Sequence, residues 1–245
     1  MPADRRVLIL GGTAEATRLA EQARQGIAPE RLVLSLAGRT LAPDRPGGIE
    51  MRIGGFGGAA GLADWLATER ITHLVDATHP FAPGISRNAA EAAAAAGVAR
   101  LTLHRPGWEE AAGDRWQRVD CLRAARDALP LGARPFLALG RQHIAPFRHR
   151  ADLRIALRIV DPPEDLPFVA DVVLGKPGDR AAETALFERL DVSHLVCRNS
   201  GGATSYAKIE AARALKLPVV LIERPAPPPP PVVGSVEAAL AWLAG

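Results

Sequence analysis

Short apolar runs alternate with helix-like segments along the whole chain. The first run, Val7–Leu10, contains no polar position, which is typical of a strand covered on both faces in a parallel sheet. Further strands are expected at residues 31–37, 51–53, 71–76, 100–104 and 116–119, with helices between them at 14–20, 61–69, 88–97 and 121–129. This alternation predicts an α/β fold with mainly parallel sheets.

The second half of the chain repeats the first. Gly54 precedes His73 by the same 19 residues (73 − 54) that separate Gly175 from His194 (194 − 175), and similar strand and helix patterns follow both histidines. We therefore expect two tandem Rossmann-like domains, residues 1–130 and 131–245, joined by a linker at 130–135 and enclosing a ligand cleft. The prolines at 227–231 would form a stiff spacer leading to a last strand and a helix at 235–243.

A glycine pair follows the first strand. Gly11 and Gly12 allow a tight turn and close approach of a ligand, and Thr13 is suited to cap the helix that begins with Ala14 and Glu15. Free N–H groups at that helix start favour a phosphate. The full G-x-G-x-x-G pattern is absent, and a Gly-Gly turn also occurs where strand and helix merely pack. The second copy, which has Gly140, Arg141 and Gln142 at this place, favours cofactor binding, because it shows that the fold does not require paired glycines.

Three further loops are expected at the same sheet edge. The second strand ends near four polar or glycine residues: Ser35, Gly38, Arg39 and Thr40. This cluster suits the 2′-phosphate of NADP better than the ribose diol of NAD. The next two loops contribute Gly55, Phe56, Asp76, Ala77, Thr78 and His79. All of these residues are cofactor-binding candidates.

The second copy carries side chains where the first carries bare backbone. Its loops place cationic and hydrogen-bonding groups at one predicted edge, which suits carboxylates or phosphates. These substrate-binding candidates are Arg141, Lys176, Arg198, Asn199, Ser200, Gly201, Thr204, Ser205, Tyr206 and Lys208. A scattered set of solvated charges is the alternative reading.

Composition narrows the classes of function. The net charge is only +3 despite a pI near 9.3, aromatic residues make up 4% and basic residues are dispersed, all of which disfavour a nucleic-acid partner. Cys121 and Cys197 lack metal-ligand spacing, so no metal site is expected. No apolar run approaches a membrane span, and we expect a cytoplasmic protein without a membrane partner; a monomeric state is compatible with the sequence.

Four segments together resemble the precorrin-6A reductase family of cobalamin biosynthesis: the stretches at 10–17, 76–82, 104–108 and 199–208. The resemblance implies reduction of a ring double bond of precorrin-6A by NADPH to give precorrin-6B, with a polycarboxylate tetrapyrrole as substrate. It also assigns the first two segments named to the nucleotide side. Family members commonly have glycine where Ala16 stands, which bears on the closest approach of the pyrophosphate.

Several alternatives remain at this stage. The substrate could be cobalt-precorrin-6A, or the chain could be a non-enzymatic two-domain anion or tetrapyrrole carrier. A short-chain-type reductase is disfavoured, because Lys208 follows Tyr206 by two residues instead of four. His79 and Tyr206 are the candidates for the proton donor, although His79 could instead bind the loop or nicotinamide and Tyr206 could simply pack on the substrate.

Overall fold

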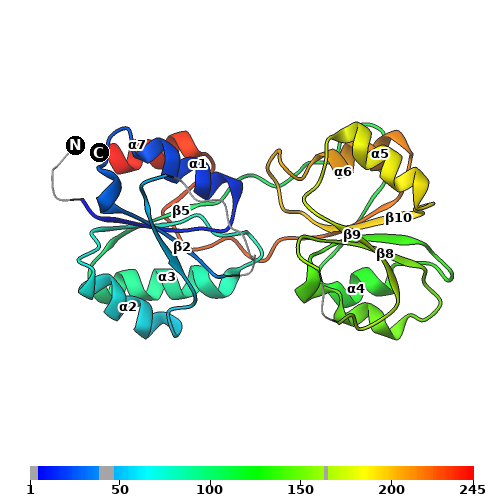
Figure 1. Ribbon diagram of the computed structural model, residues 1–245, viewed down its shortest axis with the longest axis horizontal. Coiled ribbons are helices and arrows are strands. Elements are labelled where there is room, and N and C mark those ends of the chain that lie inside the picture. Colours follow the sequence, from blue (N-terminus) through cyan, green and yellow to red (C-terminus); the bar gives the residue numbers. More distant parts are fainter. Residues whose placement is uncertain (1–4, 39–46, 163–164) are drawn as a thin grey trace. The chain divides into compact units, whose positions relative to one another are not determined.

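The computed structural model describes residues 5–38, 47–162 and 165–245, and the chain divides into two compact units (Figure 1). Unit 1 comprises Met1–Pro106 together with Pro225–Gly245, and unit 2 comprises Gly107–Arg224. The chain therefore crosses between the units twice.

Unit 1 is built around a parallel sheet. Among the described residues its strands are ordered β12-β5-β4-β1-β2-β3. The strands are β1 (Val7–Leu10), β2 (Leu32–Leu36), β3 (Glu50–Ile53), β4 (His73–Asp76), β5 (Ala99–Leu103) and β12 (Val232–Val233). The helices are α1 (Ala14–Ala23), α2 (Gly58–Thr68), α3 (Pro83–Ala96) and α7 (Val236–Ala244), with the short 3₁₀ turn η1 (Pro29–Arg31).

Helices cover both faces of this sheet, as Figure 1 shows for α1 and α7 on one side and α2 and α3 on the other. Alternate residues of β1 explain the arrangement: Val7 and Ile9 join the core under α1 and α7, whereas Leu8 and Leu10 join the core under α2 and α3. The unbroken apolar run at 7–10 thus marks a central strand, as predicted.

Unit 2 repeats this topology, with the strand order β6-β11-β10-β7-β8-β9 among its described residues. Its strands are β6 (Trp116–Val119), β7 (Pro135–Ala138), β8 (Ile155–Ile159), β9 (Ala170–Leu174), β10 (His194–Arg198) and β11 (Val219–Ile222). The helices are α4 (Leu122–Asp127), α5 (Arg180–Arg189) and α6 (Ala207–Ala214). Two 3₁₀ turns, η2 (Arg141–His143) and η3 (Ala145–His149), replace the helix that follows the first strand of unit 1. The predicted repeat and α/β class are confirmed.

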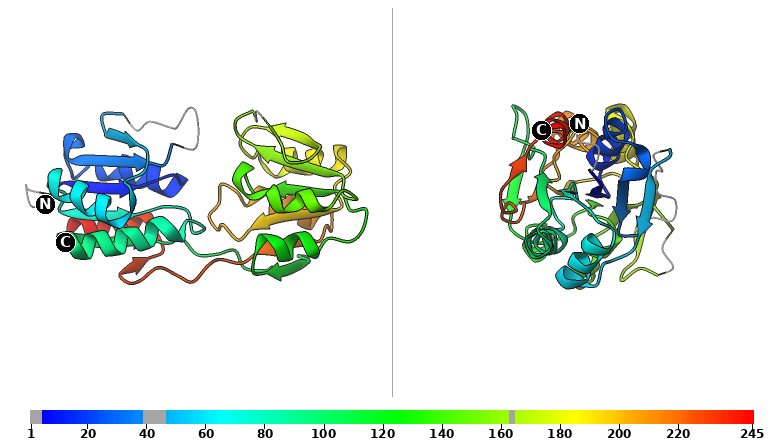
Figure 2. Two further views of the ribbon diagram at one scale, coloured as in Figure 1. Left: turned by 90° about the horizontal axis from the view of Figure 1, so that it is seen from below. Right: turned by 90° about the vertical axis from the view of Figure 1, so that its left-hand side faces the viewer.

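The last strand and helix of each repeat are exchanged between the units. β6 and α4 follow β5 in the chain, yet β6 pairs with β11; β12, which follows β11, pairs with β5 (Figure 2). The expected division at 130/131 and the linker at 130–135 therefore differ from the structure, in which that segment lies inside unit 2. The physical reason is that each terminal segment completes the other repeat. β6 extends the sheet of unit 2 by pairing with β11, whereas β12 and α7 complete the sheet and core of unit 1, where Val236 and Leu243 are buried.

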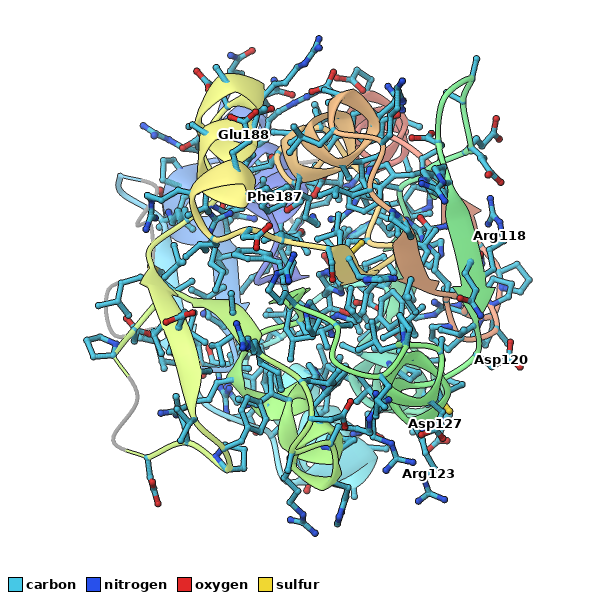
Figure 3. The ribbon with its side chains drawn as sticks, turned by 90° about the vertical axis from the view of Figure 1, so that its right-hand side faces the viewer. Arg118, Asp120, Arg123, Asp127, Phe187 and Glu188 are labelled. Carbon is cyan, nitrogen blue, oxygen red and sulfur yellow. The ribbon has the colours of Figure 1, made fainter. Side chains whose placement is uncertain are left out.

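The helix α4 begins with a side-chain cap. Cys121 Sγ accepts a hydrogen bond from the backbone N–H of Ala124. Figure 3 shows Asp120 and Asp127 at the outer surface of this part of unit 2, whereas Phe187 of α5 points into the unit, where it is buried. Among the described residues, no helix is long and apolar enough to cross a membrane.

Candidate functional site

The turn after β1 leads into a helix that is capped at Thr13, as the sequence predicts. Thr13 caps α1, because its Oγ1 accepts a hydrogen bond from the N–H of Ala16 at 3.1 Å. Gly11 and Gly12 are needed at this turn for different structural reasons. A Cβ on Gly11 would lie 2.8 Å from Leu34 Cδ1, whereas Gly12 has open space around it but a φ of +107°. Gly11 thus permits close packing, and Gly12 permits the backbone conformation that presents the helix start.

Hydrogen bonds connect this turn to its neighbours on both sides. The N–H of Gly11 donates to the carbonyl of Ser35 at 2.8 Å, and Thr13 Oγ1 donates to the carbonyl of Ala77 at 2.8 Å. The candidate residues after β1, β2 and β4 thus lie together at one sheet edge. Arg39 and Thr40 lie outside the described residues, and their role stays a prediction.

An ion pair accompanies the first turn of α1. Arg105 Nη1 donates to Glu15 Oε2 at 2.5 Å, and both side chains are largely buried. Burial lowers the pKa of Arg105, although Glu15 opposes this shift. The Glu15 carboxylate is therefore balanced by a cation at a helix start where a phosphate is expected.

The second glycine loop is held by a residue that the sequence did not indicate. Arg52 donates to the carbonyls of Gly54 and Gly55, at 2.7 Å each, and its guanidinium lies 3.7 Å from the centre of the Phe56 ring. Gly55 and Phe56 are thereby fixed beside the carboxyl end of β3.

The loop after β4 borders a pocket of about 270 Å³ in unit 1, which we call the β4–β5 pocket. Within the loop, Asp76 Oδ1 accepts from both the N–H and the Oγ1 of Thr78, and His79 Nδ1 accepts from the N–H of Phe81 at 3.2 Å. A neutral His79 therefore carries its proton on Nε2. The pocket is lined by Asp76, Thr78, His79, Pro80, Pro83, Ser86, Arg87, Thr102, Leu103, His104 and residues 226–229.

A larger hollow of about 410 Å³ lies between the carboxyl ends of α1 and α7. It adjoins the amino edge of the sheet, because these helices run opposite to the strands. Ligands of open α/β sheets bind at the carboxyl edge, so the β4–β5 pocket is the relevant one.

The candidates of unit 2 fall into two groups. Asn199 and Lys208 are buried, with polar atoms used inside the unit: Asn199 Oδ1 accepts from the N–H of Trp108 at 2.7 Å, and Lys208 Nζ donates to the carbonyl of Ser205 at 2.5 Å. Burial lowers the pKa of Lys208. The Tyr206 hydroxyl accepts from Arg213, which also pairs with Asp114. Substrate binding stays a prediction for these residues and for Arg141, Lys176, Arg198, Ser200, Gly201, Thr204 and Ser205.

We next compared the chain with known protein families, relatives and solved structures. Residues 6–244 match the family model described as "Precorrin-6x reductase CbiJ/CobK". The chain belongs to this family of reductases.

Relatives in the precorrin-6x reductase family span nearly the same length. The precorrin-6A reductase of Rhodobacter capsulatus is 46% identical, covering 98% of this chain and 96% of its own, and that of Sinorhizobium is 44% identical, covering 98% and 94%. The cobalt-precorrin-6A reductase of Salmonella typhimurium is 26% identical, covering 90% and 88%. A solved structure titled "CobK precorrin-6A reductase" is 45% identical with a TM-score of 0.93, covering 98% of this chain and 96% of that one.

Sequence reasoning missed several residues that border the candidate site. Arg52, Ser86, Arg87, Thr102 and His104 lie outside the recognisable glycine loops. Thr102 could have been found, because it occupies the β5 position paired in register with Asp76. Ser86 and Arg87 lie in an alanine-rich helix, whose pattern does not indicate which residues border a pocket.

Proposed function

We propose that this protein reduces a ring double bond of precorrin-6A with NADPH, giving precorrin-6B in cobalamin biosynthesis. The observation that carries the proposal is the capped turn after β1, joined by hydrogen bonds to the ends of β2 and β4, in a chain that belongs to the precorrin-6x reductase family. The greater identity to precorrin-6A reductases than to the cobalt-precorrin-6A reductases favours the cobalt-free substrate.

Unit 1 has the residues to hold a dinucleotide. The N–H groups at the start of α1 suit the pyrophosphate, and Gly12 leaves the backbone accessible there. Arg39 would pair with the 2′-phosphate and thereby select NADPH over NADH. The orphaned buried oxygen of Asp76 also fits a ligand that donates a hydrogen bond.

When bound, NADPH would supply the hydride that saturates the double bond of the macrocycle together with one proton. The chain must orient the two reactants and admit the proton. His79 and Tyr206 remain the candidates for the proton donor, and the cationic residues of unit 2 are proposed to attract the substrate carboxylates.

The test uses NADPH deuterated at the transferable position, incubated anaerobically with precorrin-6A and the full-length protein. We expect the tetrapyrrole product to gain one deuterium atom from the cofactor and one proton from water, as measured by mass spectrometry. Reduction without transfer of the label would contradict direct hydride transfer, and an unchanged tetrapyrrole would contradict the proposed substrate.

A further inference from the structure

Asn199 lies where the chain enters and leaves unit 2. The unit begins at Gly107 and ends at Arg224, and Asn199 directly follows β10, an interior strand of its sheet. The residue is 4% exposed. A buried amide side chain needs partners for its donor and its acceptor, so the contacts of Asn199 indicate what it does.

The side chain of Asn199 binds the first segment by which the chain crosses between the units. Oδ1 accepts a hydrogen bond from the N–H of Trp108 at 2.7 Å, and Nδ2 donates to the carbonyl of Trp108 at 3.3 Å. Gly107 leaves room for the amide, because a Cβ there would lie 3.2 Å from Asn199 Nδ2 and 3.3 Å from Oδ1. One side chain thus holds both backbone groups of Trp108.

The backbone of Asn199 binds the second crossing segment. Its N–H donates to the carbonyl of Ile222 at 2.8 Å, and its carbonyl accepts from Arg224 Nε at 2.7 Å. Ile222 ends β11, and Arg224 is the last residue of unit 2. A single residue is therefore bonded to both segments through which the chain passes between the units.

Asn199 is also the first residue of the stretch between β10 and α6, which we call the 199–206 loop. Trp108 holds the rest of this loop: its Nε1 donates to the carbonyl of Gly202 at 2.9 Å, and its ring centre lies 5.8 Å from that of Tyr206. Lys208, in the first turn of α6, places Nζ 4.6 Å from the centre of the Trp108 ring. The loop is thus bound to a residue that Asn199 itself fixes.

The internal repeat shows that the fold does not require this anchor. Asn199 stands five residues after His194, and Thr78 stands five residues after His73 at the corresponding place in unit 1. Thr78 donates its hydrogen bonds within its own loop, to Asp76. The asparagine anchor is therefore a feature of unit 2, the unit proposed to bind the substrate.

We propose that Asn199 is a positioning residue, which ties the 199–206 loop to both crossing segments and thereby fixes the loop groups offered to the substrate, those of Ser200, Thr204 and Ser205. The inference rests on the proposed function, which assigns this loop to the substrate. Asn199 acts through Trp108 and Arg224, because its own polar atoms are already bonded to them.

The first test measures whether Asn199 restrains the crossing segments. Cys121 offers an exposed thiol in unit 2, Cys197 is buried, and Asp64→Cys adds a thiol at an exposed position of α2 in unit 1. Spin labels on the two exposed thiols report the distribution of distances between them by double electron–electron resonance, without any ligand. We expect Asn199→Ala to broaden this distribution and the control Asn88→Ala, in α3, to leave it unchanged. An unchanged distribution in Asn199→Ala would overturn the anchoring of the crossing segments.

The second test separates the loop from the crossing segments. Trp108→Phe keeps a ring and both backbone bonds to Asn199, but it lacks the donor to Gly202. Amide hydrogen exchange at residues 201–206 should become faster in Trp108→Phe and in Asn199→Ala, whereas only Asn199→Ala should broaden the distance distribution. Unchanged exchange of these amides in both variants would overturn the anchoring of the loop.

Steady-state kinetics connect the anchor to the reaction. Asn199→Ala should raise the KM for precorrin-6A about 10-fold and lower kcat by a smaller factor, with the Kd for NADPH unchanged, because the phosphate turn lies in unit 1. A merely destabilised protein would instead lose active enzyme at constant KM. An unchanged KM would overturn the positioning role. A wild type that does not reduce precorrin-6A would overturn the proposed function, whereas the distance and exchange measurements, which need no substrate, would still decide the anchor.

Discussion

The hydroxyl of Thr13 donates a 2.8 Å hydrogen bond to the carbonyl of Ala77, while its oxygen accepts from the N–H of Ala16. One side chain thus caps α1 and joins the turn after β1 to the loop after β4. These are the two loops between which a dinucleotide is expected to lie.

Thr13→Ala should therefore affect both stability and binding. Loss of the cap predicts a decrease of about 1–2 kcal/mol in the free energy of unfolding, measured in urea. Weaker NADPH binding should accompany it, because the two loops lose their connection. Thr13→Ser keeps the hydroxyl and serves as the control. An alanine variant that loses stability but binds NADPH normally would show that the bond between the loops is irrelevant to the cofactor.

Arg39→Ala tests the choice between the two nicotinamide cofactors. The prediction comes from the sequence, since Arg39 lies outside the described residues. NADPH binding should weaken by about 1–3 kcal/mol, the contribution of a charge-assisted contact to the 2′-phosphate, while NADH binding stays nearly the same. Fluorescence titration of both cofactors measures the difference. Equal weakening of the two would refute contact with the 2′-phosphate.

The repeated histidines predict how stability depends on pH. His73 Nδ1 lies 2.8 Å from Thr72 Oγ1, and His194 Nδ1 lies 2.9 Å from Ser193 Oγ. Burial lowers the pKa of both histidines, and the positive charges of Arg5 and Arg115, respectively, lower it further. The unfolded chain therefore binds more protons, so the free energy of unfolding should fall as the pH drops below about 6.5.

Urea titrations at several pH values, on the wild type and on a variant carrying His73→Gln and His194→Gln, measure this contribution. The double variant should lose less stability between neutral and mildly acidic pH. An identical pH dependence in the two proteins would assign the effect to other groups.

The two cysteines should differ sharply in reactivity. Cys197 is fully buried in β10, and burial raises its pKa to about 11, whereas Cys121 is exposed at the start of α4. The thiolate is the reactive form, so a thiol reagent at neutral pH should modify Cys121 rapidly and Cys197 only after unfolding. Peptide mass mapping with time identifies each site, and Cys121→Ser provides the control. Rapid modification of Cys197 in the folded protein would contradict its burial.

The sequence predicted the repeated unit because strand composition and glycine positions are local signals. Val7–Leu10 lacks polar positions, Thr13 is a favourable cap, and Gly97 ends α3 with a φ of +66°. The partner of a terminal strand is not a local property. The pattern at Trp116–Val119 predicts a strand, and the structure has one there, but only the three-dimensional structure shows that it completes the second sheet.

For the candidate site too, the sequence predicted the local features but not the contacts that depend on packing. Glycine loops identify the phosphate turn, whereas the orphaned oxygen of Asp76 depends on which neighbours reach it. In unit 2, Asn199 and Lys208 have residue types suited to a substrate, but their burial and their contacts with Trp108 and Ser205 depend on packing. Residue type indicates what a side chain can bind, and packing decides which partner it meets.

The most direct measurement of the central claim is an anaerobic assay with purified full-length protein, NADPH and precorrin-6A. NADPH oxidation, followed by its absorbance, is compared with loss of the substrate. The account predicts one NADPH oxidised for each precorrin-6A consumed, with precorrin-6B as the product and a lower rate with cobalt-precorrin-6A. Absence of NADPH oxidation with precorrin-6A under these conditions would contradict it.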